Sequence, residues 1–149
     1  MPRSFDQIVH ELGMLGAEDF DYGEPGSNGM ERLHELTDEL LLLPQPEKGI
    51  RALFDVIERM PETDLGSPGP IVHTLERLLG HYENELADSI RRRPAFLSVW
   101  MVNRILNGAR TSEQKAYYMD LLRVAAEHPS APESARREAN DFIRYQRKA

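Results

Sequence analysis

The chain has 149 residues, the length of one ordinary domain, and 40% of them are hydrophobic. It contains no cysteine, which excludes a disulfide scaffold, a thiolate zinc site and a cysteine nucleophile. Apolar runs such as Leu40–Leu43 are far shorter than the roughly 20 residues of a membrane span, and the N-terminus lacks the apolar region of a secretory signal. We therefore expect a single domain over residues 1–149 that is cytoplasmic and does not enter a membrane.

The net charge of −7 is unevenly distributed along the chain. Residues 1–67 hold 15 Asp and Glu against 5 Lys and Arg, a net charge of −10, whereas residues 68–149 carry a net charge of +3. An acidic half disfavours direct binding to nucleic acid, because phosphates need cationic partners. It favours a basic protein partner, although a charged, solvated surface without a partner explains the same composition.

Helical spacing of apolar residues recurs through the first half of the chain. A short helix around residues 8–12 is followed by an acidic, glycine-rich loop over residues 16–29. Asn28 and Glu31 have the spacing of a capping box at the start of the next helix, which Pro44 ends. A third helix is expected between Pro46 and Pro61.

The second half of the chain shows the same spacing. One helix is expected from the Gly66–Pro70 cluster to Gly80, and another from Tyr82 to the arginines before Pro94. Residues 95–107 are apolar around most of a helix circumference, which is typical of a helix buried on several sides. Thr111 with Gln114 and Ser130 with Glu133 have the spacing of capping boxes for two further helices.

This pattern of about eight helices, without any strand pattern, predicts an all-α protein. Short connections favour stacked antiparallel helical hairpins, that is, a short HEAT-like α-solenoid. A compact orthogonal helix bundle is the alternative, because the sequence has no clean internal repeat.

The glycine- and proline-rich segment Gly66–Pro70 precedes a helix, as phosphate-binding loops do. No Lys-Ser or Lys-Thr pair follows it, and Pro68 and Pro70 each remove a backbone N–H that an anion would need. The segment therefore predicts a rigid corner between two helices.

Residues able to carry catalysis do not form a recognisable motif. His73 with Glu76 and His81 with Glu85 each resemble half of a carboxylate-bridged metal motif, but a di-metal site would need two such units that face each other and further glutamates. Neither the zinc-protease spacing of histidines nor a Gly-x-Ser-x-Gly motif occurs. We expect no catalytic residue, no cofactor and no metal; an enzyme with a metal at these four residues is the least favoured alternative.

A polar and aromatic stripe marks the otherwise apolar segment 95–107. Trp100, Asn103, Arg104 and Asn107 have the spacing of one helix face. Trp and Arg are typical anchors of protein interfaces, which suggests partner binding. The alternative is a structural role in which Asn103 and Arg104 bind groups inside the fold, the Gly66–Pro70 corner being one candidate.

Carboxylates interleaved with aromatic residues in the loop at residues 18–24 suit a basic partner surface, since charge steers the encounter and aromatic rings anchor it. A solvated loop is the alternative. The set expected to contact a partner consists of Asp19, Asp21, Tyr22, Glu24, Glu35, Asp38 and Glu39.

The segment from residue 65 to residue 107 resembles a known family. It reads LGSPGPIVHTLE at residues 65–76, then Tyr82-Glu83, Ser89, Arg93-Pro94 and VWMVNRILN at residues 99–107. These motifs resemble the small all-helical immunity proteins found beside bacterial polymorphic and contact-dependent growth inhibition toxins. The similarity covers about 43 of the 149 residues.

The resemblance implies a protein that binds the C-terminal domain of a cognate toxin in the cytoplasm and inhibits it non-covalently, without cofactor or catalysis. A basic toxin domain, such as a nuclease, suits an acidic inhibitor. The shared motifs would maintain the fold, and recognition would lie in the acidic N-terminal half. A HEAT-like scaffold or adaptor for a protein or peptide is the alternative function. The residues assigned to the structural motif are Gly66, Pro68, Gly69, Pro70, Trp100, Asn103 and Arg104.

Overall fold

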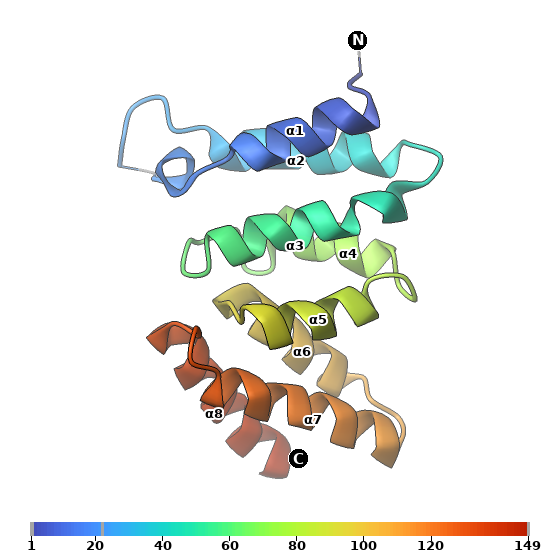
Figure 1. Cartoon of the computed structure of the whole chain (residues 1–149), viewed down its shortest axis with the longest axis vertical. Coiled ribbons are helices and arrows are strands. Elements are labelled where there is room, and N and C mark those ends of the chain that lie inside the picture. Colours follow the sequence, from blue (N-terminus) through green and yellow to red (C-terminus); the bar gives the residue numbers. More distant parts are fainter. Residues whose placement is uncertain (1, 22, 149) are drawn as a thin grey trace. The chain divides into compact units, whose positions relative to one another are not determined.

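The structure, a computed structural model, describes residues 2–21 and 23–148 (Figure 1). Within these ranges the chain forms eight α-helices and two short 3-10 helices, and no strand, which confirms the prediction of an all-α protein. No helix in the described part of the chain is long and apolar enough to cross a membrane. The elements are α1 (Phe5–Met14), η1 (Ala17–Phe20), α2 (Gly29–Leu41), η2 (Pro46–Gly49), α3 (Ile50–Arg59), α4 (Gly69–Arg77), α5 (Glu83–Arg92), α6 (Phe96–Asn107), α7 (Ser112–Glu127) and α8 (Glu133–Lys148).

The chain divides into two compact units, residues 1–85 and residues 86–149, with the boundary inside α5. The first is called unit 1 and the second unit 2. The expectation of one domain over the whole chain stays a prediction.

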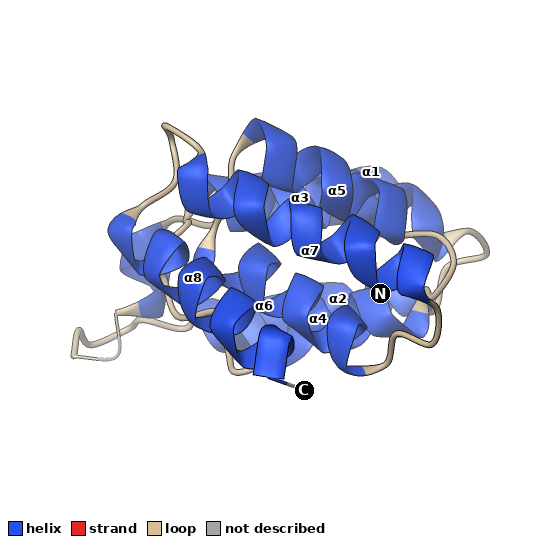
Figure 2. Cartoon of the chain, turned by 90° about the horizontal axis from the view of Figure 1, so that it is seen from below, coloured by secondary structure: helices blue, strands red, loops and turns tan. Residues whose placement is uncertain are grey.

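Unit 1 contains two antiparallel helix pairs, α1 with α2 and α3 with α4 (Figure 1). Helix α1 packs against both α2 and α3, and α2 packs against α4. The first and third helices therefore form one layer of the unit and the second and fourth the other (Figure 2). The apolar stripes predicted from the sequence fill the space between the layers; fully buried members include Ile8, Leu12, Leu33, Leu36, Leu40, Leu53, Phe54, Ile57, Ile71 and Leu75.

The segment before α4 forms a tight corner, as the sequence predicts. Gly66 has a φ of +105°, and a Cβ added to it would lie 2.3 Å from the Cα of Gly69. The backbone N–H of Gly66 donates to Oδ1 of Asp64 over 2.9 Å, and the Ser67–Pro68 peptide bond is cis. A side chain at residue 66 would force the corner open.

Unit 2 is built on α6, α7 and α8, each of which packs against the other two. The end of α5 is attached to the turn between α7 and α8, because Nε2 of His128 lies 2.8 Å from the carbonyl oxygen of Arg91. Small residues let the helices approach closely. The buried side chains include Val99, Val102, Leu121, Leu122, Ala125, Ala135 and Ala139.

Two of the three predicted capping boxes are wrong, and the third holds in part. Asn28 precedes α2 but makes no side-chain cap, since its ψ of 22° departs from the extended conformation that a capping residue needs. Helix α8 begins at Glu133, and the hydroxyl of Ser130 contacts His128 instead of capping it. Thr111 does cap α7 by accepting from the N–H of Gln114.

Two large apolar residues of the helical pattern, Leu79 and Tyr117, are exposed rather than buried. Leu79 is 73% exposed because α4 ends at Arg77, so the helical periodicity no longer applies to it. Tyr117 is 43% exposed, and its ring lies edge-on to the buried Tyr118.

Candidate partner-binding surface

The boundary between the units also divides the charge. Unit 1 contains 18 Asp and Glu against 6 Lys and Arg, a net charge of −12. Unit 2 contains 7 Asp and Glu against 12 Lys and Arg, a net charge of +5. The two structural units therefore differ more in net charge than the two parts of the chain on either side of residue 67.

Helix α2 presents part of this negative charge on one exposed stripe. Its inner face buries Leu33, Leu36 and Leu40 against the other helices of unit 1. The opposite face must then carry the polar residues, and it does so with three carboxylates at helical spacing. These exposed carboxylates belong to Glu31, Glu35 and Asp38.

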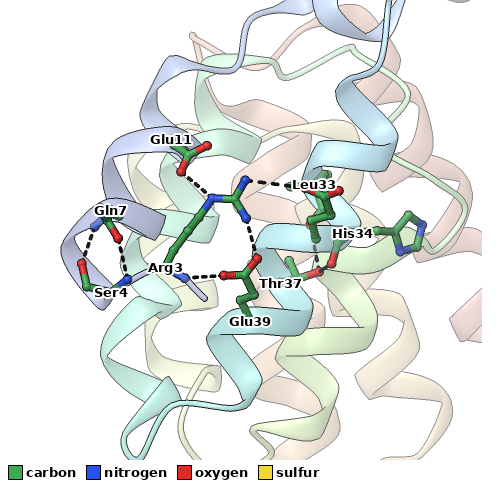
Figure 3. A network of polar contacts seen from close by, with 9 residues as sticks. Arg3, Ser4, Gln7, Glu11, Leu33, His34, Thr37 and Glu39 are labelled. Carbon is green, nitrogen blue, oxygen red and sulfur yellow. Dashed lines mark hydrogen bonds and ion pairs between the residues drawn. The ribbon is translucent and has the colours of Figure 1, made fainter. Parts of the chain in front are cut away.

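Glu39 is bound inside unit 1 by a network around Arg3 (Figure 3). The backbone N–H of Arg3 donates to Oε1 of Glu39 over 2.6 Å, and its guanidinium forms ion pairs with Glu39 and Glu11 and lies 3.6 Å from Glu35. The backbone hydrogen bond and the adjacent cation lower the pKa of Glu39, whereas the hydrogen bond to Glu11 raises the pKa of Arg3. Glu39 thus links the N-terminal residues to α2.

Asp19 also has a role within the fold. Its Oδ2 accepts from the N–H of Gly16 over 2.9 Å, and its Oδ1 lies 3.8 Å from the guanidinium of Arg32. The hydroxyl of Ser27 donates to the carbonyl oxygen of Asp19 over 2.6 Å, and a Cβ at Gly29 would lie 2.6 Å from that oxygen. The first part of the acidic loop is therefore folded onto the start of α2.

The remaining predicted contact residues differ in their surroundings. Asp21, Glu24 and Asp38 are exposed and form no ion pair with any residue that the structure describes. Oδ1 of Asp21 accepts from the N–H of Gly23 over 3.1 Å. Tyr22 lies outside the described residues. Of the expected set, Asp38 and Glu35 lie together on α2, and Asp21 and Glu24 lie in the loop that leads to it.

A polar groove between α2 and α4 adjoins the acidic stripe, and sequence reasoning did not find it. Its volume is about 120 Å³. From α2 it is lined by His34, Thr37, Asp38 and Leu41. The Thr37 hydroxyl donates to the carbonyl oxygen of Leu33 in the same helix (Figure 3). The signal available in the sequence was a histidine and a threonine on each helix, but only packing shows that the two helices face one another. The lining from α4 consists of Pro70, His73, Thr74 and Arg77.

The stripe on α6 is divided between structural and exposed residues. Nε2 of Gln146, on α8, donates to Oδ1 of Asn103 over 2.8 Å and to Oδ1 of Asn107 over 2.9 Å. Asn103 is buried, and Gln146 is its hydrogen-bond partner within unit 2. Trp100 is partly exposed and stacks on Phe96 with 6.1 Å between ring centroids, and Arg104 is exposed.

The residues considered for catalysis are not assembled into a metal site. Within the described residues, no three His, Cys, Asp or Glu side chains are grouped so that they could hold a metal ion. One serine–histidine contact that the sequence analysis missed does occur, because Oγ of Ser130 lies 3.0 Å from Nδ1 of His128. The N–H of Ser130 donates to the same nitrogen, so this contact belongs to the turn before α8.

The chain is therefore an all-α protein. Its acidic unit 1 exposes a stripe of carboxylates on α2, beside a small polar groove. No protein-family model, curated protein or solved structure matches it.

Proposed function

We propose that this chain is an immunity protein that binds a cognate bacterial toxin domain in the cytoplasm and inhibits it by direct, non-covalent contact. The toxin domain carries a basic surface, for which a nuclease is one candidate. The contact lies on unit 1, over the exposed carboxylates of α2 and the acidic loop before it. The proposal assigns no reaction and no cofactor to this chain.

The observation that carries the proposal is the net charge of −12 on unit 1, presented in part by exposed carboxylates on α2. Such a surface attracts a basic protein and speeds its association. Glu35 and Asp38 are well placed for this, because α2 is rigidly packed on its inner face. The similarity of residues 65–107 to small immunity proteins supports the same function.

The alternative is a scaffold that binds peptides from several proteins. The groove between α2 and α4, at about 120 Å³, is below the usual range of roughly 300–1,000 Å³ for ligand pockets and offers little room for an extended peptide. This favours recognition by the surface of one folded partner.

The test is capture of the tagged full chain from the lysate of its own cell, followed by identification of what co-elutes. We expect one stoichiometric basic protein whose C-terminal domain arrests growth when expressed alone and does not when this chain is co-expressed. Many weakly bound proteins would favour the scaffold. A captured protein without toxicity would contradict the immunity function.

The contact surface is tested with a pair of charge-matched double variants. Glu35→Lys with Asp38→Lys reverses the α2 stripe, whereas Asp55→Lys with Glu62→Lys makes the same charge change on α3 and the turn after it. We expect the first variant to weaken toxin binding about tenfold or more and the second to have a smaller effect. Equal effects would show that net charge, and not this surface, governs binding.

A further inference from the structure

A second groove lies in unit 2, between α7 and α8, and has a volume of about 490 Å³. Helix α8 contributes residues at helical spacing, and α7 runs antiparallel beside it in the same helical hairpin. Three of the lining residues are arginines, and Ile143 forms a largely buried part of the wall. The lining residues are Arg123, Ala126, Glu127, Asn140, Ile143, Arg144 and Arg147.

The arginines of this groove are available to a ligand. Arg123 and Arg144 pair with Asp120 and Asp141, each three residues earlier on the same helix, and all four side chains are about half exposed or more. Exposed pairs of this kind contribute little to stability, so a ligand can replace them at small cost. Arg147 forms no ion pair with any residue in the described part of the chain.

The geometry points to a ligand with several negative charges. Among the residues that the structure describes, Arg147 lacks a carboxylate partner of the kind that Arg123 and Arg144 have, so an anion in the groove can supply the missing counter-charge. The planar guanidinium fork matches the oxygens of a phosphate and can bind two of them at once. Three such forks can engage more oxygens than a single phosphate offers. Glu127 disfavours an anion beside it, which places the phosphates toward Arg144 and Arg147.

The charge of the whole chain limits the size of this ligand. A net charge of −7 opposes a long polyanion such as nucleic acid, which extends beyond the groove. A compact ligand responds mainly to the groove itself, because charges beyond about 8–10 Å are largely screened at physiological ionic strength. The groove volume is also within the range of sites for small molecules.

We propose that the groove between α7 and α8 binds a compact ligand with a chain of two or three phosphate groups, of the kind found in nucleoside di- and triphosphates. Asn140 adds an amide that can donate to the same ligand. This site is separate from the carboxylate stripe of unit 1 and does not rest on the proposed function.

The test is isothermal titration calorimetry of the full chain with sodium tripolyphosphate, ATP and orthophosphate, each without added divalent metal. We expect one tripolyphosphate per chain, with binding at least tenfold tighter than that of orthophosphate. Tighter binding of ATP than of tripolyphosphate would identify a nucleotide as the source of the phosphates, and equal binding a simple polyphosphate. Absence of tripolyphosphate and ATP binding at millimolar concentration would overturn the proposal.

Variants locate the site. Arg147→Glu is expected to reduce tripolyphosphate affinity about tenfold or more, since it removes a charge-assisted hydrogen bond and adds a repulsive charge. Arg110→Glu makes the same charge change in unit 2 at a residue outside the groove, and should have a much smaller effect. Far-ultraviolet circular dichroism confirms that both variants are folded. Equal losses in the two variants, or tighter binding of an octauridylate RNA than of tripolyphosphate, would contradict a compact-ligand site.

Discussion

Single residues at tight positions are the most direct link between this sequence and its structure. Gly66 is the strongest example, because it combines a positive φ with a close approach to Gly69. No other residue type satisfies both conditions without moving the backbone. The tight corner before α4 is therefore the physical reason for a glycine at this position.

Replacing Gly66 with alanine is expected to destabilise the protein by about 1–3 kcal/mol, because the new Cβ would overlap the Cα of Gly69. Thermal unfolding followed by circular dichroism measures the change. Gly13→Ala is the control, since nothing lies within 4 Å of its Cβ position and it lies inside α1; this variant should be neutral or slightly more stable. A Gly66→Ala protein as stable as the wild type would contradict the tight corner.

Glu39 gives the protein a defined sensitivity to acid. Folding lowers the pKa of this carboxyl, chiefly through the N–H of Arg3, so its contribution to stability is complete at neutral pH. The contribution decreases once the pH falls below the ordinary pKa of a glutamate, and it is lost as the pH passes through the lowered pKa of Glu39 in the folded protein.

We therefore expect Glu39→Gln to be less stable than the wild type at pH 7 and the difference to disappear in acid. Chemical denaturation at a series of pH values measures it. Glu31 is an exposed carboxylate on the same helix. Glu31→Gln should change the stability less, and this change should depend less on pH. A stability difference for Glu39→Gln that grows as the pH falls would show that folding does not lower the pKa of Glu39.

Between helices, polar contacts fix the packing of unit 2. Gln146 joins α8 to α6 by donating to both Asn103 and Asn107. Because Asn103 is buried, loss of this donor leaves its side-chain oxygen without a partner in an apolar setting.

Gln146→Ala is expected to lower the free energy of unfolding of unit 2 by about 1–3 kcal/mol. The single tryptophan, Trp100, lies on α6 and reports this transition by fluorescence during urea denaturation. Arg137→Ala, at an exposed position of α8, should change stability by less than about 0.5 kcal/mol. If the two variants were equally stable, the amide network would have no energetic role.

The sequence predicts that a helix is present more reliably than it predicts the residue at which the helix begins. Apolar spacing correctly located the helix containing Leu33, Leu36 and Leu40, since that periodicity reflects burial on one side. The capping boxes at Asn28 and Ser130 failed because a cap needs a particular backbone conformation, and other contacts of the loop determine that conformation.

For the molecule as a whole, residues 1–85 carry a net charge of −12 and residues 86–149 one of +5, so the two units attract partners of opposite sign. If the partner is a basic domain, the association rate constant should fall about tenfold or more as ionic strength rises from about 0.01 to 0.15 M, because the Debye length shrinks from about 30 to 8 Å. Stopped-flow or surface plasmon resonance measurements with the captured partner test this. A rate constant independent of salt would exclude electrostatic steering by unit 1.

The candidate site was only partly visible in the sequence. Counting charges located the acidic half, and this is a property of composition. It did not show that Glu39 is bound to Arg3, because these residues lie 36 positions apart and no periodic signal connects them. Such a long-range contact forms only when α2 packs beside the N-terminal residues.

Hydrophobic periodicity, helix-breaking residues and net charge established an all-α chain with an acidic N-terminal part, because each is a local property of the sequence. Packing decided which carboxylates stay exposed, that α2 faces α4 across a polar groove, and that arginines of α7 and α8 line another. These features depend on which helix faces touch, and that choice follows from the fit of many side chains at once rather than from any one segment.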